Sequence, residues 1–239
     1  MLFGGRIVLK SAFEELTITE SWFPRAQAGA GPHFHREHAD SFYVLEGELA
    51  FLVDDEEHVL GPGASVSAPP GVVHGFRSLS PARFLNFHTP DGGFADNLRA
   101  RDRGEPGGFD SFDAEPGSGL PGSDAILLGA GEGEALRANH RVATIKVGRT
   151  ELALIEFELE PSFEGPDLHS HDDHTDAFYV LAGTVELQLG DERIVAGAGT
   201  LAAAPPGVAH TFTSGPEGGR VLNIHAPSTD FHVRLREMS

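Results

Sequence analysis

Residues 33–47 of this 239-residue chain read His33-Phe34-His35-Arg36-Glu37-His38-Ala39-Asp40-Ser41-Phe42-Tyr43-Val44-Leu45-Glu46-Gly47. Residues 169–183 repeat them as His169-Ser170-His171-Asp172-Asp173-His174-Thr175-Asp176-Ala177-Phe178-Tyr179-Val180-Leu181-Ala182-Gly183. The two stretches share the pattern H-x-H-x-x-H-x-D-x-F-Y-V-L-x-G at an offset of 136 residues. A pattern of this length at a fixed offset indicates a duplicated domain.

Two shorter motifs are also repeated. Gly63, Pro69-Pro70-Gly71-Val72 and His74 recur at the same offset as Gly199, Pro205-Pro206-Gly207-Val208 and His210. Leu85-Asn86-Phe87-His88-Thr89-Pro90 recurs one residue further along as Leu222-Asn223-Ile224-His225-Ala226-Pro227. Because domains of roughly 100 to 150 residues are the commonest, we predict an N-terminal domain over 1–101, a Gly- and Pro-rich linker over 102–124 and a C-terminal domain over 125–239.

Composition narrows the function classes. The formal net charge of −19 argues against binding to nucleic acid or to anionic membrane surfaces, since both need clustered Lys and Arg. The absence of cysteine excludes disulfides, thiolate metal sites and a cysteine nucleophile. Residues 1–6 do not resemble a signal peptide, and no run of about 18 apolar residues occurs. We therefore expect a cytoplasmic protein.

Turn residues recur at short intervals, and no long segment of helical periodicity interrupts them. This spacing predicts an all-β sandwich or barrel in each half. Residues 46–48, Glu-Gly-Glu between two apolar runs, have the signature of a hairpin turn. Residues 94–101 and their copy 231–236 are predicted to form short helices that close each domain.

The repeated histidines have the spacing of a metal site. Side chains two residues apart on an extended segment point to the same side, so His33 and His35 converge. Asp40 begins the next apolar run, and His74 follows a rigid Pro-x-Gly turn. The same set returns as His169, His171, Asp176 and His210. A lone buried histidine would be structural, but three nitrogens and a carboxylate in both halves predict one divalent transition metal per domain, with Fe, Mn, Ni, Zn, Cu and Co not distinguishable.

Four further histidines have more than one interpretation. His38 and His174 are partners that support the ligands, surface residues, or ligands in place of the aspartate. His88 and His225 lie near the end of a strand, where they line the pocket, shuttle protons or make ordinary hydrogen bonds. These last two are the candidate catalytic residues.

These motifs resemble those of the cupin superfamily, and the chain as a whole resembles a bicupin with a layout similar to quercetinase-type dioxygenases. His33, His35, Asp40 and Gly47 match the first family motif, G-x5-H-x-H-x3-4-E-x6-G. Gly63, Pro69, Gly71 and His74 match the second, G-x5-P-x-G-x2-H-x3-N. The C-terminal matches are His169, His171, Asp176, Gly183, Gly199, Pro205, Gly207 and His210. The resemblance implies two tandem double-stranded β-helix (jelly-roll) barrels, with four ligands around one metal in each.

Some positions depart from the family pattern. Asp40 and Asp176 stand where the family usually has Glu, and the shorter arm would reach the metal through water, lower its affinity or change the preferred ion. Ser78 and Ser214 replace the last Asn of the second motif, and the first glycine of the first motif is missing.

Apolar side chains with the same parity as the ligands either fill the barrel core or line an apolar cavity. They are Phe42, Val44 and Phe76, with the copies Phe178, Val180 and Phe212. A cavity beside an open metal suits a small apolar or aromatic, enolic or phenolic substrate together with O2, so we predict a metal-dependent oxidoreductase of the dioxygenase type.

An oxalate decarboxylase fits less well, because that chemistry favours an arginine near the metal to hold a dicarboxylate. Only Arg36 and Arg77 lie near the first motifs, and neither recurs in the second half.

Two other functions stay open. In the first, the chain is a non-catalytic protein that binds or senses a metal or a small ligand. In the second, the barrels are purely structural and the histidines are vestigial. Pairing of two copies into a homodimer is compatible with barrels of this type.

Overall fold

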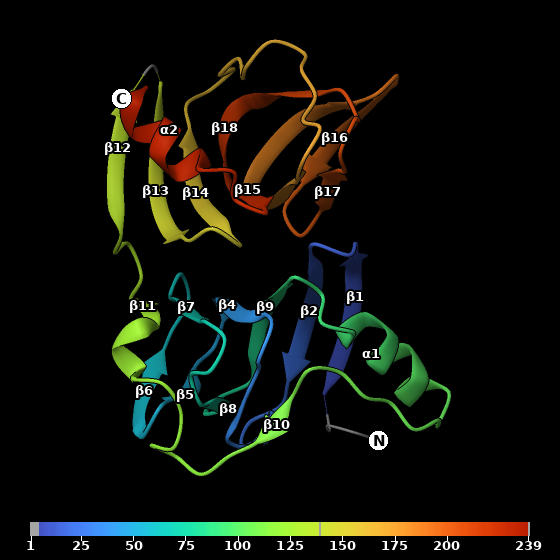
Figure 1. Ribbon diagram of the computed structural model, residues 1–239. Coiled ribbons are helices and arrows are strands. Elements are labelled where there is room, and N and C mark those ends of the chain that lie inside the picture. The colour runs from blue at the N-terminus through green and yellow to red at the C-terminus, as the bar shows by residue number, and fades with distance from the viewer. Residues whose placement is uncertain (1–4, 139, 239) are drawn as a thin grey trace. The chain divides into compact units, whose positions relative to one another are not determined.

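The computed structural model describes residues 5–138 and 140–238 and divides the chain into two compact units, Met1–Glu132 and Gly133–Ser239. We call them barrel 1 and barrel 2. Each is built mainly of antiparallel β-strands and, within the described residues, carries one short α-helix (Figure 1). The predicted all-β class is confirmed.

Barrel 1 contains two sheets, with strand orders β1-β2-β9-β4-β7-β11 and β10-β3-β8-β5-β6. Its strands are β1 (Arg6–Ala12), β2 (Thr17–Phe23), β3 (His33–Phe34), β4 (Ala39–Glu46), β5 (Leu49–Val53), β6 (Glu56–Leu60), β7 (Ser65–Ala68), β8 (His74–Ser78), β9 (Ala82–Thr89), β10 (Phe112–Asp113) and β11 (Ile126–Leu128). Its helices are α1 (Phe94–Asp102) and a 3-10 turn at Gly122–Asp124.

Barrel 2 forms one continuous sheet of order β12-β13-β14-β18-β15-β16, with β17 also paired to β15. Its elements are β12 (Glu134–Ala138), β13 (Arg141–Gly148), β14 (Ala153–Leu159), β15 (Thr175–Leu189), β16 (Glu192–Gly197), β17 (Leu201–Ala204), β18 (His210–Ala226) and α2 (Phe231–Glu237). The long strands β15 and β18 pair along their whole length. They follow the path that barrel 1 divides into β4 with β5 and β8 with β9.

The stretch around Gly47 is a corner and not the predicted hairpin. β4 pairs with β7 and β9, whereas β5 pairs with β6 and β8, so the strands on its two sides belong to different sheets. Gly47 has φ 74° and its copy Gly183 has φ 71°. A Cβ at either position would collide with the main-chain oxygen of Pro81 or Gly218, so this corner needs glycine.

Apolar side chains fill the interior of both barrels, and the predicted core positions Phe42, Val44, Phe178 and Val180 are buried. Burial of each such side chain contributes about 1.5 to 3 kcal/mol. The buried polar residues include a group of histidines and aspartates in each barrel: His33, His35, His38, Asp40, His74 and His88, then His174, Asp176, His210 and His225. Because burying polar groups is costly unless they are paired, these groups need a specific explanation.

Residues 102–124 were predicted to be a linker between the domains. In the structure they pack on barrel 1. β10 pairs with β3, and Leu120 bridges to Val72. The Phe112 ring lies 5.6 Å from that of Phe34. β11 continues this association by pairing with β7. The division between the two units therefore lies after Glu132 and not before Ala125. A segment too rich in Gly and Pro to build its own core can still form main-chain hydrogen bonds by pairing with a neighbouring sheet.

The two predicted helices are present as α1 and α2. The Phe94 ring of α1 stacks on His88 with centroids 3.7 Å apart, and the Phe231 ring of α2 stacks on His225 at 3.8 Å. Each helix thus begins against the histidine group of its own barrel. Neither is long and apolar enough to cross a membrane, a finding that concerns the described residues.

Candidate metal centres

Strand pairing brings the predicted ligands of barrel 1 together. His33 on β3 lies opposite His74 on β8, and Asp40 on β4 lies opposite His88 on β9. His35 follows β3 directly, two residues after His33, so both rings face the same side. Ring centroids of His33 and His74 are 4.4 Å apart, and those of His33 and His35 are 4.8 Å apart.

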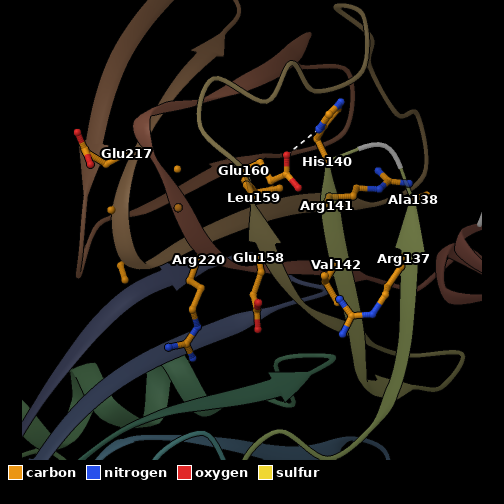
Figure 2. A pocket seen from close by; sticks show the side chains of 14 residues that line it. Arg137, Ala138, His140, Arg141, Val142, Glu158, Leu159, Glu160, Glu217 and Arg220 are labelled. Carbon is orange, nitrogen blue, oxygen red and sulfur yellow. Dashed lines mark hydrogen bonds and ion pairs between the residues drawn. The ribbon is translucent and has the colours of Figure 1, made fainter.

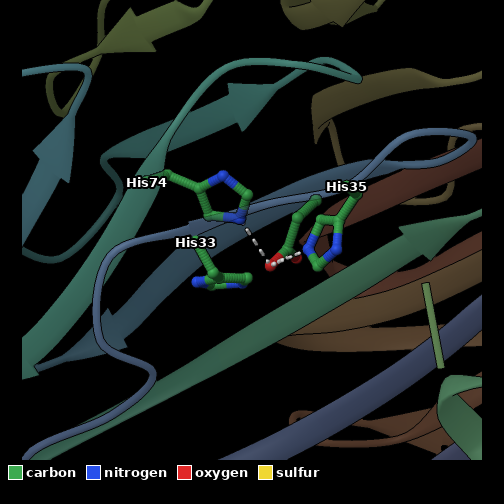
Figure 3. A group of neighbouring side chains, drawn as sticks. His33, His35 and His74 are labelled. Carbon is green, nitrogen blue, oxygen red and sulfur yellow. Dashed lines mark hydrogen bonds and ion pairs between the residues drawn. The ribbon is translucent and has the colours of Figure 1, made fainter. Parts of the chain in front are cut away.

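The four predicted residues of barrel 1 could hold one metal ion. One ligand atom each from His33, His35, Asp40 and His74 lie within 4.8 Å of one another, and all four side chains are buried. The Asp40 Oδ2 atom is 3.3 Å from His74 Nε2 and 3.6 Å from His35 Nε2. In Figure 3, dashed lines join His35 and His74 to this carboxylate oxygen, and the ring of His33 lies beside them.

Barrel 2 repeats the arrangement with a small difference. One nitrogen each from His169, His171 and His210 lie within 4.8 Å of one another, but Asp176 is not within that distance of all three. Asp176 Oδ2 is 3.1 Å from His210 Nε2 and 3.9 Å from His171 Nε2. The carboxylate therefore lies beside two of the three rings.

Main-chain carbonyls fix the orientation of most of these rings. Each Nδ1 atom donates to a carbonyl oxygen: His33 to Gly31 (2.8 Å), His35 to Asp110 (2.5 Å), His74 to Val72 (3.0 Å), His169 to Asp167 (2.8 Å) and His210 to Val208 (2.9 Å). A carbonyl oxygen only accepts, so Nδ1 carries the proton and the lone pair of a neutral ring is on Nε2. Such a second partner is typical of histidines that bind metals.

Two nitrogen atoms show that the residues fit a metal ion. The Nε2 atoms of His35 and His171 are buried and, within the described residues, have no hydrogen-bond partner. A buried polar atom left unpaired costs about 1 to 3 kcal/mol, so such atoms are rare unless something else satisfies them. A divalent cation beside these lone pairs and the carboxylate would do so.

At His33, His171 and Asp40, local electrostatics favour the protonation states that bind metals. Burial, together with the nearby His74 and His35, lowers the pKa of His33 to about 4. Burial likewise lowers the pKa of His171 to about 4, and His174 adds to the effect. The pKa of Asp40 lies well below its usual value, because His88 and the other rings outweigh the opposing effect of burial. Neutral rings beside an ionised carboxylate are the form that a cation requires.

Asp176 and His210 stabilise each other's charged form. The pKa of Asp176 is lowered, since His225 and the hydrogen bond from His210 outweigh the effect of burial. The pKa of His210 is raised, because its hydrogen bond to Asp176 outweighs burial.

The ambiguous histidines form a second group in each barrel. His35, His38 and His88 also offer three nitrogens within 4.8 Å, as do His171, His174 and His225. In barrel 1, however, His38 Nε2 contacts His88 Nδ1 at 3.0 Å, and His88 Nε2 donates to Asn86 Oδ1 at 3.0 Å. His38 Nδ1 lies 3.1 Å from a carboxylate oxygen of Asp110. Because all four ring nitrogens are engaged, these contacts favour His38 and His88 as supporting partners.

Barrel 2 contains the same chain of hydrogen bonds. His174 Nε2 contacts His225 Nδ1 at 3.0 Å, and His225 Nε2 donates to Asn223 Oδ1 at 2.9 Å. At its outer end, His174 Nδ1 lies 2.8 Å from Asp173, whose side chain is 71% exposed. The chain therefore connects the buried site with a carboxylate at the surface.

Two asparagines were missed by the sequence analysis. The Asn86 amide donates to Asp40, and the Asn223 amide donates to Asp176 at 2.5 Å. Each also accepts from His88 or His225, so it orients the carboxylate. The signal was available, because Asn-x-His occurs both in residues 85–90 and in their repeat 222–227, with both side chains on one face of the strand.

Asp110 and Phe109 of barrel 1 were also missed as site residues. The Asp110 carboxylate accepts from the main-chain N–H groups of Arg36 and Glu37, at 2.9 and 2.7 Å. These bonds lower its pKa despite the opposing effect of partial burial. The Phe109 ring lies 5.8 Å from that of His35. No repeat pointed to either residue, because the segment has no copy in the second half.

The two centres open into cavities of different size. The barrel 1 cavity measures about 340 Å³ and the barrel 2 cavity about 620 Å³. Of the predicted lining residues, Phe42 and Phe76 line the first and Phe178 and Phe212 the second, whereas the two valines do not. A separate hollow of about 750 Å³ on barrel 2 is bordered by charged residues such as Arg137, Glu158 and Arg220 and contains no predicted ligand (Figure 2).

Comparison with known proteins finds similarity in sequence and in fold. The chain aligns with Bacillus subtilis quercetin 2,3-dioxygenase at 38% identity over 45 residues, which are 19% of this chain and 13% of that enzyme. A putative glyoxylate-induced protein from Pseudomonas aeruginosa has a similar structure, with a TM-score of 0.68, 16% identity, and coverage of 95% of this chain and 81% of that one. Bacillus subtilis oxalate decarboxylase, a protein with Mn(II) centres, gives a TM-score of 0.61, 17% identity and coverage of 93% and 72%.

At these identities the structural likeness concerns the fold. The family assignment comes from a sequence match in both halves. The model of the Cupin domain family matches residues 23–88 in barrel 1 and 155–225 in barrel 2, more than half of the chain. Both matches contain the histidine motifs around which the sites are built. The chain therefore belongs to the cupin family and carries two cupin domains in tandem.

Proposed function

We propose that each barrel binds one divalent transition metal, and that the metal-loaded protein is an oxidoreductase of the dioxygenase type acting on a small apolar or aromatic substrate with an enolic or phenolic group. The ligands are His33, His35, Asp40 and His74 in barrel 1, and His169, His171, Asp176 and His210 in barrel 2. The proposal rests above all on the buried, unpartnered Nε2 atoms of His35 and His171.

The metal, when bound, supplies a Lewis acid for an enolate or phenolate oxygen. Asn86 and Asn223 hold the carboxylate arms in place through their amide hydrogen bonds. In barrel 2, His225 lines the cavity, and its Nε2 atom donates to Asn223, so it holds that amide against the carboxylate of Asp176. His174 and Asp173 continue this chain of contacts from His225 to the surface.

The composition of the barrel 2 cavity supports an aromatic substrate. Five phenylalanines line it: Phe157, Phe163, Phe178, Phe212 and Phe231. A volume of about 620 Å³ lies in the range of small-molecule sites. The local similarity to quercetin 2,3-dioxygenase agrees with this reaction type, and the Mn(II) centres of oxalate decarboxylase make Mn one of the ions to test. The cytoplasmic location and the homodimer remain predictions.

Metal analysis followed by oxygen uptake tests the proposal. The protein is reconstituted separately with Fe, Mn, Ni, Co, Zn and Cu, and bound metal is measured by elemental analysis. We expect two ions per chain with at least one metal, and O2 consumption with a flavonol or a dihydroxy aromatic compound. Failure to retain any of these metals stoichiometrically would contradict the proposal.

A non-catalytic role is favoured for one barrel by a specific observation. In barrel 1, Phe109 packs over the site, and His35 has a side chain only 1% exposed. A metal held there would be less accessible to substrate than one in barrel 2, where the His171 side chain is 19% exposed. Loss of O2 uptake in His171→Gln but not in His35→Gln would assign catalysis to barrel 2 and binding alone to barrel 1.

A further inference from the structure

The cavity of barrel 2 contains two arginines that the sequence analysis did not consider. Arg141 and Arg234 line it together with the histidine group. Arg141 is half-buried, and its guanidinium carbon lies 5.7 Å from the ring centroid of Phe157. On β13 it alternates in step with the core residues Ala143 and Ile145, so its side chain belongs to the interior face.

The orientation of Arg141 differs from that of its charged neighbours. Arg137, Glu158 and Arg220 lie on the opposite side of the sheet, where they border the outer hollow (Figure 2). Arg141 also borders that hollow, but its contact with Phe157 directs the guanidinium toward the cavity with the histidines. Arg234 reaches the same cavity from α2 and donates to Thr229 Oγ1 at 3.3 Å.

Neither arginine has a carboxylate partner within residues 5–138 and 140–238. Other arginines of barrel 2 do: Arg193, Arg220 and Arg236 each form an ion pair with a glutamate. Burial lowers the pKa of Arg141, as expected for a cation removed from water without compensation. A half-buried, unpaired guanidinium is costly, so it favours the arrival of an anion.

The acidic residues of the cavity do not supply that anion. Asp176 is engaged by His210 and Asn223, and Glu164 lies exposed at the rim. Arg234 lines the same cavity as Arg141 and the histidine group, and its guanidinium carbon lies 6.0 Å from the ring centroid of Phe231. Two positive side chains thus line a cavity that is also lined by the histidine group of barrel 2.

We propose that the substrate of barrel 2 is a small organic carboxylate. Its carboxylate group is held by Arg141 and Arg234, and its aromatic or aliphatic body packs against the phenylalanines beside the histidine cluster. A guanidinium offers two parallel N–H donors that match a carboxylate. The proposal rests on the proposed function in one respect, since it places the carboxylate-bearing molecule where the metal-dependent reaction occurs.

Barrel 1 lacks both positive side chains at these places. The pairing of Leu9 with Thr19 corresponds to that of Ile145 with Ile155, and this register places Gly5 where barrel 2 has Arg141. The helices align on Phe94 and Phe231, which places Asn97 where barrel 2 has Arg234. The barrel 1 cavity instead has Arg101 together with Asp113. The carboxylate site therefore belongs to barrel 2 alone.

Paired probes test this assignment on the full-length, metal-reconstituted protein. Benzoate and its neutral analogue benzamide are titrated by calorimetry into the wild type, Arg141→Gln, Arg141→Lys and the control Arg137→Gln, which alters the outer face of the same hairpin. We expect benzoate to bind at least about tenfold more tightly than benzamide, because a hydrogen bond to a charged group contributes about 1.5 to 3 kcal/mol. Arg141→Gln should weaken benzoate about tenfold or more, Arg141→Lys should weaken it less, and Arg137→Gln should have no effect.

Two outcomes would overturn the proposal: equal affinity for benzoate and benzamide, or equal effects of Arg141→Gln and Arg137→Gln. Folding is checked by thermal unfolding without ligand, where Arg141→Gln should not lower Tm, since it removes an uncompensated cation. His35→Gln serves as the barrel 1 control, and loss of benzoate binding in that variant would contradict the assignment to barrel 2.

Metal content is measured on every sample, so the two proposals fail separately. If no metal binds, the proposed function fails, yet the comparison of benzoate with benzamide still decides the arginine site. If metal binds in barrel 2 and benzoate shows no dependence on Arg141, only the carboxylate site is refuted.

Discussion

The two barrels hold nearly the same histidine and aspartate groups under different coverings. In barrel 1, Phe109 and Asp110 lie over the group, and His35 is 1% exposed at its side chain. In barrel 2, His171 is 19% exposed, and no phenylalanine of the described residues packs on it as Phe109 does on His35. The cavities differ accordingly, at about 340 and 620 Å³.

The strands inside each barrel determine which ligand residues come together, whereas the residues at the rim determine how the group is covered. The ligands lie on paired strands, so the same register reproduces the same group in both halves. The rim is built from residues that the two halves do not share, namely the segment around Asp110 in barrel 1 and the two arginines in barrel 2. We infer that barrel 1 retains its metal and that barrel 2 exchanges ligands with solvent.

The strongest test removes one ligand from each barrel in turn. His35→Gln and His171→Gln should each reduce the metal content from two ions per chain to one, because the loss of a central nitrogen donor weakens its site beyond retention. Elemental analysis after gel filtration measures this. The double variant should bind none. If either single variant keeps both ions, the residue in question is not a ligand and its barrel uses another group, such as the one that contains His38 or His174.

A weaker effect should follow from removing the outer carboxylate of the hydrogen-bond chain. Asp110→Ala removes the acceptor for His38 and for two main-chain N–H groups, so we expect metal affinity in barrel 1 to fall by about 10- to 100-fold, as for other supporting partners of metal ligands. Competition with a chromophoric chelator measures this affinity. Asp173→Ala is the matched control in barrel 2.

The side chain of Asp173 is 71% exposed and contacts His174, whereas Asp110 also accepts from two main-chain N–H groups, so the loss of Asp173 should matter less. Equal effects of the two substitutions would show that the covering of barrel 1 does not strengthen its site.

The sequence predicted the ligand residues inside the barrels far better than the residues that cover them. His33, His35 and His74 could be chosen because strand parity and a repeated motif place them, and the structure brings them together beside Asp40. Asp110 could not be found in this way. It is 75 residues from His35 along the chain, and only the folding of the Gly- and Pro-rich segment onto β3 brings them into contact.

Arg141 shows a second limit of prediction. Its position before an apolar run resembles a strand end, and nothing in the sequence tells whether its side chain faces outward or inward. The burial of Ala143 and Ile145 settles that question, because they are separated from Arg141 by even numbers of residues on β13. A prediction that the substrate carries a carboxylate therefore needed the fold, whereas a prediction of the metal ligands did not.

The rate of metal loss offers a more sensitive comparison of the two coverings. With excess chelator, we expect metal to leave in two phases of equal amplitude, fast from barrel 2 and slow from barrel 1. Phe109→Ala should speed the slow phase by a few-fold and leave the fast phase unchanged, since it opens only the covering of barrel 1. Stopped-flow absorbance of the chelator complex records both phases. A single phase in the wild type would show that the coverings do not control access.

The smallest expected difference concerns acid stability without metal. Burial is the main cause of lowered pKa values for three histidines of barrel 1, His33 (about 4), His38 (about 4) and His88 (about 3). In barrel 2 the same holds for His171 and His225, both about 4. Between pH 6.5 and about 4 the unfolded chain binds protons that the folded chain does not, so acidification in this window favours unfolding. Above pH 6.5 these rings contribute no pH dependence.

The lowered pKa values of Asp40 and Asp176 act below this window, since their stabilising effect is lost only as pH falls toward their folded-state values. With three affected rings against two, barrel 1 should lose more stability than barrel 2 between pH 7.5 and pH 5. We expect the Tm of the chelated protein to fall by about 5 °C or more, since about 1 kcal/mol moves Tm by several degrees. Hydrogen exchange, corrected for intrinsic rates, would resolve the two barrels through β4 and β15. His88→Gln should reduce the loss in barrel 1, and an equal loss in both barrels would show that burial of these rings does not control acid stability.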